Sequence, residues 1–174
     1  QKAGTYGTLY LESTTGKYLF QPNSNASLNA LSASGSDSFT VTASDGSTTG
    51  SNTLSVNFTG ANDTPIVSAP AAIQLTDTAA VDSFNVSFGT LAATDAEGNT
   101  LTYGITGSSA ASLTSSASGS SVTYNLQKAG TYGTLYLEST TGKYLFQPNS
   151  NASLNALSAS GSDSFTVSAS DGNT

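Results

Sequence analysis

The chain has 174 residues, four lysines against eleven acidic residues, a formal net charge of −7, and no Cys, His, Met or Trp. The absence of Cys excludes disulfide scaffolds and thiolate metal sites, and the absence of His removes the usual ligands of zinc, copper and haem. An acidic chain without Arg repels phosphate backbones, so nucleic-acid binding is not expected, and no apolar run approaches the length of a membrane span. Oxygen atoms are the metal ligands that remain, and they suit calcium.

A long internal repeat is the main feature of the sequence. Residues 1–41 recur without change as residues 127–167, and the match continues to Gly46 and Gly172 with one difference, Thr42 against Ser168. The chain therefore spans more than one period of a tandem array whose unit is of ordinary domain size. A unit of that size is expected to hold its own core, like a bead on a string.

Apolar and polar residues alternate in short segments along the whole chain, which is the pattern of half-buried strands. These segments are residues 9–11, 39–43, 54–58, 84–88, 101–105 and 122–126. Turn sequences such as "STTGK", "DAEGN" and "SDG" separate them, and no helical period lasts longer than one turn. The sequence predicts an all-β fold, a sandwich of antiparallel strands. For the low-complexity stretch 107–121, a loop and a weakly marked strand both remain possible.

The domain boundary is predicted at "TGANDTPIV", where Pro65 cannot continue a central strand. On this register residues 1–61 are the C-terminal half of one unit, and residues 62–65 are a linker. Residues 66–174 are the next unit without its last strand, the counterpart of residues 53–59. Either flanking sequence or strand exchange with neighbouring molecules would complete the two units.

Strand parity predicts a cluster of acidic residues at one end of the unit. In a head-to-tail array the chain enters a unit at one end and leaves at the other. Counting strands from both ends then brings the loop 94–99 and the hairpin of residue 171 to the end where the chain enters. The side chains expected there are Asn62, Asp63, Asp95, Glu97, Asn99 and Asp171.

Four carboxylates in one place repel one another, and a bound divalent cation removes that cost. The sequence therefore predicts a calcium site, to which Asp37 of the preceding unit would add a further ligand. The competing interpretation is that these acids belong to ordinary turns. Turn or strand-edge roles are expected for Asp77 and Asp82, and solvated strand faces for Glu12 and Glu138.

Four motifs of the repeat resemble those of a known family. "GTLAATDAEGNTLTYGI", "GTYGTLYLESTTGKYLFQPN", "SDSFTVTASDG" and "TGANDTP" follow one another as in the VCBS-type, cadherin-like repeats of large RTX-type bacterial surface adhesins. The resemblance implies immunoglobulin-like sandwiches in tandem, secreted and stiffened by calcium, which extend a binding domain away from the cell. Glu97 and Asn99 stand where the family commonly has Asp, and the uncharged Asn99 lowers the negative charge of this loop.

The expected function is a non-catalytic extender module of a secreted bacterial adhesin or surface fibre, located outside the cell. Its expected partners are neighbouring repeats. One alternative is a filament subunit joined to identical chains by strand exchange. Another is a module that binds glycans or other surfaces through Tyr6, Tyr10 or their copies. Catalysis is not expected, since without His or Cys no nucleophile is paired with a base by spacing.

Overall fold

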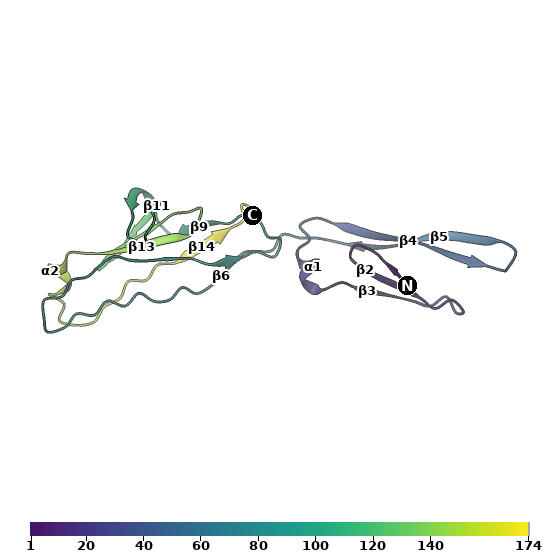
Figure 1. Ribbon diagram of the computed structural model, residues 1–174, viewed down its shortest axis with the longest axis horizontal. Coiled ribbons are helices and arrows are strands. Elements are labelled where there is room, and N and C mark those ends of the chain that lie inside the picture. The colour runs from purple at the N-terminus through teal and green to yellow at the C-terminus, as the bar shows by residue number, and fades with distance from the viewer. Residues whose placement is uncertain (174) are drawn as a thin grey trace. The chain divides into compact units, whose positions relative to one another are not determined.

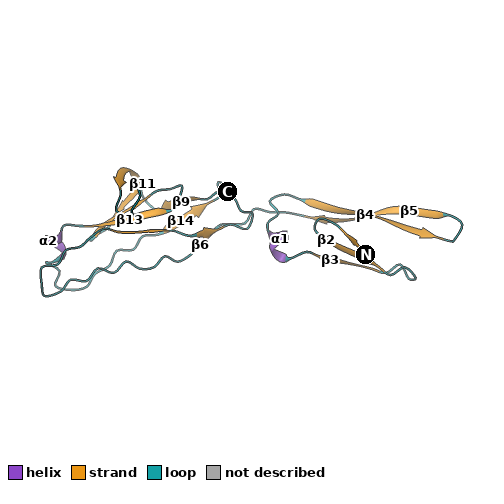
Figure 2. Ribbon diagram, in the orientation of Figure 1, coloured by secondary structure: helices purple, strands orange, loops and turns teal. Residues whose placement is uncertain are grey.

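The computed structural model describes residues 1–173 (Figures 1 and 2). It forms two compact units, which divide between Asp63 and Thr64, inside the predicted linker; residues 96–98 group with the first unit. Strands in antiparallel sheets dominate both units, and the described helices have four or five residues. The predicted all-β antiparallel fold is confirmed.

The first unit contains two antiparallel sheets. In the three-stranded sheet β2 lies between β1 and β3, and the second sheet is a hairpin of β4 and β5 with a ten-residue ladder. The elements are β1 (Lys2–Ala3), β2 (Gly7–Leu11), β3 (Tyr18–Pro22), α1 (Asn25–Asn29), β4 (Gly35–Ser44) and β5 (Thr49–Phe58). Ser24 begins α1 because its side chain accepts a hydrogen bond from the Ser27 amide.

The second unit is built around a five-stranded sheet in the order β10-β11-β12-β13-β7, with two further pairs, β14-β9 and β6-β8. Its elements are β6 (Ile66–Val67), β7 (Ser87–Thr90), β8 (Ala93–Thr94), β9 (Thr102–Ile105), β10 (Ser109–Ser115), β11 (Val122–Ala129), β12 (Gly133–Leu137), β13 (Lys143–Pro148), α2 (Asn151–Leu154) and β14 (Val167–Ser170). Apolar side chains between the sheets form its core: Leu91, Ile105, Leu135, Leu137 and Phe146.

Two segments differ from the simplest expectation. The stretch 107–121 contains a strand, β10, which pairs with β11 through a ladder that is interrupted between Ala110 and Leu113. The apolar alternation of residues 84–88 predicts a strand, but the described strand begins only at Ser87. There the chain is held by a side chain instead, because the Phe84 backbone amide donates to Oδ1 of the Asn151 side chain at 3.1 Å.

The two copies of the repeated sequence have different environments. Leu11 is 44% exposed, while its copy Leu137 is 0% exposed; Leu19 is 63% exposed, while its copy Leu145 is 1% exposed. In the second unit β7 pairs with β13, and the eight-residue β11 pairs with β12. Among the described residues of the first unit, the corresponding β3 pairs only with β2, and the other edge of β2 pairs only with the two-residue β1.

Glu12 and Glu138 close the "ESTTGK" turn, so the prediction that they lie on solvated strand faces is wrong. The Glu138 carboxylate accepts hydrogen bonds from the Thr140 amide at 2.9 Å and the Thr141 amide at 2.8 Å, and from both threonine hydroxyls. Burial by itself would raise the pKa of Glu138, but these hydrogen bonds outweigh it and lower the pKa to about 2.

This turn is expected to make stability depend on pH below the ordinary glutamate pKa of 4.5. Because the folded-state pKa is depressed, the contribution of Glu138 is fully present above pH 4.5 and is lost as the pH falls towards 2. The difference in melting temperature between the wild type and Glu138→Gln should therefore be largest near pH 6 and shrink towards pH 2. A difference that stays constant over this range would contradict the prediction.

Candidate functional site

The loop between β8 and β9 carries the predicted ligands in alternation. Asp95, Glu97 and Asn99 are half-buried, whereas Ala96 and Gly98 between them are exposed. Gly98 has a positive φ of 73°, a conformation that glycine adopts without strain. The Asn99 amide donates to Asp95 Oδ2 at 2.8 Å, which closes the turn. Alternate residues thus turn their oxygen-bearing side chains to the less exposed side of the loop.

Two carboxylate oxygens of this loop are buried without a hydrogen-bond partner, Asp95 Oδ1 and Glu97 Oε1. A desolvated carboxylate oxygen is unfavourable unless a donor or a cation satisfies it. The remaining Glu97 oxygen, Oε2, accepts a hydrogen bond from the Asp63 amide at 3.3 Å. The structure thus provides two carboxylate oxygens whose chemistry fits a hard cation.

The strand ladders of the second unit place this loop relative to its neighbours in the same unit. Thr94 pairs with Ile66, so the loop begins beside the first strand after the linker. Thr102 pairs with Ser170, so the loop ends beside the last residue of β14, directly before Asp171. Within the second unit, the loop and the turn of Asp171 therefore lie at the same end, as strand parity predicts.

The ligand set as a whole is not a cluster of acids. Within residues 1–173, no three acidic side chains form a group that could hold a metal ion. A calcium ion on the loop would therefore require amide or backbone oxygens besides the carboxylates of Asp95 and Glu97, and calcium accepts such ligands. It stays a prediction that the calcium ligands include Asn62, Asp63, Asn99 and Asp171.

Asp37 is removed from the candidate ligands, because its carboxylate is already used inside the first unit. It is 4% exposed. Oδ1 accepts the Thr5 amide at 2.7 Å, and Oδ2 accepts the amides of Tyr6 at 2.9 Å and Gly7 at 3.1 Å. These three hydrogen bonds stabilise the negative charge of the Asp37 carboxylate and hold its oxygens towards the backbone of residues 5–7. Asp37 is a structural anchor for the turn before β2.

The copy of this anchor in the second unit is Asp163, which accepts the Thr131 amide at 2.7 Å and the Tyr132 amide at 2.9 Å. In both units a glycine makes room for the carboxylate, since a Cβ atom at Gly4 or Gly130 would lie 2.4 Å from it. Sequence patterns alone did not reveal this role. The signal was present as a "GTYG" turn and a "GSDSF" strand start that recur together.

Asp82 and Asp45 behave as turn residues, whereas Asp77 Oδ1 is buried without a hydrogen-bond partner. Asp82 accepts the Thr78 amide at 2.5 Å and its hydroxyl at 3.2 Å, which is the turn role expected for it. Asp45, the copy of Asp171, accepts the amides of Thr48 at 2.7 Å and Ser47 at 2.9 Å. These two hydrogen bonds lower the pKa of the Asp45 carboxyl.

Some of the tyrosines contribute to packing. Tyr6 packs its ring on Phe58 with a centroid distance of 5.0 Å, and Tyr136 packs against the buried cluster of Val122, Tyr124 and Leu145. Tyr10, the copy of Tyr136, is exposed in the first unit. The same residue type therefore contributes to packing where neighbouring strands are present.

Comparisons of the chain with protein-family models and with curated protein sequences found no match. None of the described helices is long and apolar enough to cross a membrane.

Proposed function

We propose that the chain is a non-catalytic extender module of a secreted bacterial adhesin or surface fibre. In this proposal its β-sandwich units add length, and calcium bound by the loop 95–99 stiffens the connection between consecutive units. The observation that carries the proposal is the pair of buried carboxylate oxygens on Asp95 and Glu97 that lack a hydrogen-bond donor. The order of the four repeat motifs, which resembles VCBS-type repeats, supports the cellular context.

The chemistry of the loop favours calcium over other cations. Its candidate ligands are carboxylate, amide and backbone oxygens, and the sequence contains no Cys or His that would select a softer metal. Extracellular calcium modules have dissociation constants on the order of 10⁻⁴–10⁻³ M, which matches a site of reduced negative charge. Asp95 and Glu97 would supply the charge, and the linker residues Asn62 and Asp63 would join them in holding the ion.

The near-perfect repeat fits a mechanical role. A duplicated unit adds reach without disturbing any unique site, so identical copies are useful in an extender and redundant in an enzyme. With calcium bound, the linker would be held by the ion; without it, the acids would repel one another and the linker would bend more freely.

Calcium titration of the 174-residue chain tests the proposal. We expect saturable binding by calorimetry in the millimolar range, together with a narrower small-angle scattering distribution in calcium than in EGTA. Asp95→Asn and Glu97→Gln should each weaken binding by about tenfold or more, since each removes a charge from the ion.

The repeat offers a matched control. Asp171→Asn changes a predicted ligand, whereas Asp45→Asn changes its copy in the first unit, which lies in a turn at the tip of the β4–β5 hairpin. The first substitution should weaken calcium binding, and the second should leave it unchanged. No binding heat with calcium, or equal effects of the two substitutions, would contradict the proposed site.

A further inference from the structure

A depression with a volume of about 520 Å³ lies on the outer face of the five-stranded sheet in the second unit. Its lining comes from Thr134 and Tyr136 of β12, Gln147 and Pro148 of β13, and residues 149–151, which lead into α2. None of these side chains is acidic or basic. The depression is therefore a polar and uncharged surface that contains one aromatic ring.

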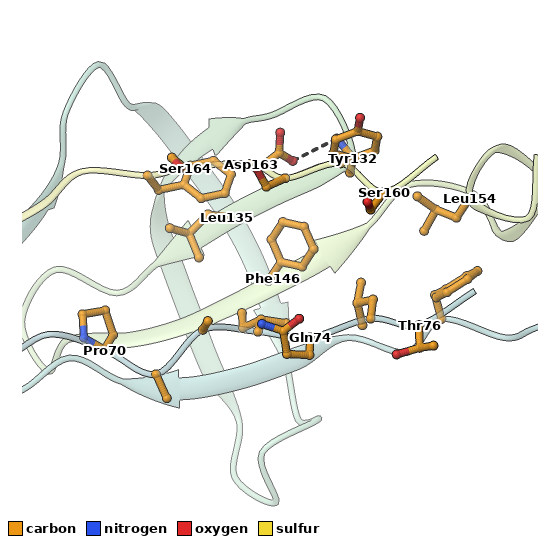
Figure 3. A pocket seen from close by; sticks show the side chains of 18 of the residues that line it. Pro70, Gln74, Thr76, Tyr132, Leu135, Phe146, Leu154, Ser160, Asp163 and Ser164 are labelled. Atoms are coloured by element: carbon orange, nitrogen blue, oxygen red, sulfur yellow. Dashed lines mark hydrogen bonds between the residues drawn. The ribbon is translucent and has the colours of Figure 1, made fainter. Parts of the chain in front are cut away.

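Strand alternation places these side chains on the face of the sheet that points away from the core. Leu135 and Phe146 lie on the core side, where they belong to the main core cluster (Figure 3). Because neighbouring residues of a strand point to opposite faces, Tyr136 and Gln147 lie on the outer side. Thr134 is directly opposite Gln147 in the ladder, so Tyr136 is a diagonal neighbour of Gln147.

The Tyr136 ring is held by apolar packing and also lines the depression. It packs against the buried cluster of Val122, Tyr124 and Leu145, in which Tyr124 and Leu145 are each 1% exposed. Tyr136 itself is half-buried, and its hydroxyl has no hydrogen-bond partner among the described residues. A ring that is already held in place loses little conformational entropy when a ligand packs on its accessible surface.

Two asparagines of the lining use one half of the side-chain amide for the fold and leave the other half available. Asn149 Nδ2 donates to the Thr131 carbonyl at 2.8 Å, which leaves Oδ1 as an acceptor. Asn151 Oδ1 accepts the Phe84 amide at 3.1 Å, which leaves Nδ2 as a donor. The exposed Gln147 side chain has no hydrogen-bond partner among the described residues, so it offers both a donor and an acceptor.

This combination of groups matches an uncharged carbohydrate. A sugar ring has an apolar C–H face that packs on an aromatic ring, and its hydroxyls both donate and accept hydrogen bonds. A charged ligand would find no opposite charge in the lining, and the net charge of −7 repels anions in particular. A peptide could not add as a strand here, because β12 and β13 are paired along both edges.

We propose that the depression binds one uncharged sugar residue of a glycan. The Tyr136 ring would lie against the apolar face of the sugar, and the side-chain amides of residues 147, 149 and 151 would bond its hydroxyls. The lining shares no residue with the loop 95–99, so this inference goes beyond the calcium-dependent extender and does not depend on it. With one ring and a few polar groups, the dissociation constant for a single sugar is expected to be millimolar.

The repeated sequence presents the same arrangement in the first unit. Thr8 lies opposite Gln21 in the β2–β3 ladder, and Asn23 Nδ2 again donates to a backbone carbonyl at 2.8 Å. Tyr10, the copy of Tyr136, is 38% exposed. A tandem array would therefore carry one weak site in each repeat, and several such sites on one polymeric glycan would act together through their high effective concentration.

NMR titration with methyl glycosides tests the site on the 174-residue chain. The probes are the methyl glycosides of glucose, galactose, mannose and N-acetylglucosamine, each added to tens of millimolar. A Tyr10→Leu background removes the aromatic ring of the copy in the first unit. At least one probe should give saturable chemical-shift changes at the amides of residues 134–136 and 147–151. If no probe shifted these amides, or if only amides elsewhere responded, the proposal would be overturned.

Two substitutions separate sugar binding from folding. Gln147→Ala removes a side chain without a hydrogen bond in the fold, so it should weaken binding several-fold and leave the melting temperature unchanged. Tyr136→Leu keeps apolar packing on the buried cluster but removes the aromatic face, and it should weaken binding about tenfold. Unchanged binding in both variants would overturn the proposed contacts.

The matched control is Gln127→Ala, the same substitution on the neighbouring strand β11. Gln127 lies opposite Tyr136 in the β11–β12 ladder but does not line the depression. Its removal should leave sugar binding unchanged. An effect as large as that of Gln147→Ala would show that the sugar does not bind in the depression.

Titrations in calcium and in EGTA distinguish this site from the loop 95–99. Equal affinity for the sugar is expected in both, because no carboxylate lines the depression. Sugar binding that is lost in EGTA would mean that a bound ion holds the sugar, which would overturn the depression as the site. Failure of calcium to bind the loop would leave the expected sugar titration unchanged, so the two proposals can fail separately.

Discussion

Leu137→Ala is expected to destabilise the second unit by about 3 kcal/mol, whereas Leu11→Ala should destabilise the first unit by less than about 1 kcal/mol. The two leucines occupy the same place in identical 41-residue sequences. Leu137 is 0% exposed and belongs to the main core cluster, so truncation leaves a cavity as well as losing apolar burial. Leu11 is 44% exposed, and much of its side chain is already in contact with water.

Hydrogen exchange resolves the two units in one experiment, since each unit has its own ladder of strand amides. Amides of β12 and β13 should lose protection in Leu137→Ala, and those of β2 and β3 should change little in Leu11→Ala. Residues 11 and 137 have the same neighbours in sequence and the same strand propensity. The Leu11→Ala variant is therefore an internal control for effects of local sequence. Equal losses in the two variants would mean that the first unit buries this face as fully as the second.

Asp37→Ala is expected to be the most damaging single change in the first unit, with a loss of about 3 kcal/mol. The buried carboxylate accepts hydrogen bonds from three backbone amides. A hydrogen bond to a charged group contributes about 1.5–3 kcal/mol to stability, and the contributions of three bonds to one carboxylate do not simply add. Its removal would leave amides of the turn before β2 without partners. Asp37→Asn should be less damaging, since one acceptor oxygen remains.

The control for this prediction is Asp45→Ala, which removes an exposed turn carboxylate from the same unit. Its expected effect is below about 1 kcal/mol. Chemical denaturation followed by hydrogen exchange of the β2 amides measures both changes. If Asp37→Ala were as mild as Asp45→Ala, the carboxylate would not be the anchor of this turn.

Much of the fold follows from local pattern. The period-two alternation in residues 39–43, 54–58, 101–105 and 122–126 coincides with strands β4, β5, β9 and β11. This succeeds because a strand with one face in the core must alternate apolar and polar residues. The pattern of residues 84–88 predicted too long a strand, since Asn151 on a distant helix satisfies the Phe84 amide there.

The sequence anticipated part of the geometry at the candidate site, and calcium binding there stays a prediction. The alternation of Asp95, Glu97 and Asn99 agrees with their half-buried side chains, and two of the carboxylate oxygens lack donors. Asp37 was assigned to the metal from its place before a strand, but its partners are amides about thirty residues away in the chain. Glu12 was assigned to a strand face, although it closes a turn through Thr14 and Thr15. The position of an acidic residue in the sequence does not show which hydrogen-bond donor its carboxylate contacts in the fold.

The sequence by itself determined the strand pattern, the repeat and the kind of atoms that could bind a metal, because each depends on residue type and spacing along the chain. Only the tertiary structure decided which copy of each residue is buried. Leu11 and Leu137 share every local neighbour, yet the second is enclosed by strands that the first does not meet. Phe39 and Phe165 show the reverse, since β5 covers the first. Burial is a property of long-range strand partners, and identical sequences acquire different partners when different segments are present to pair with them.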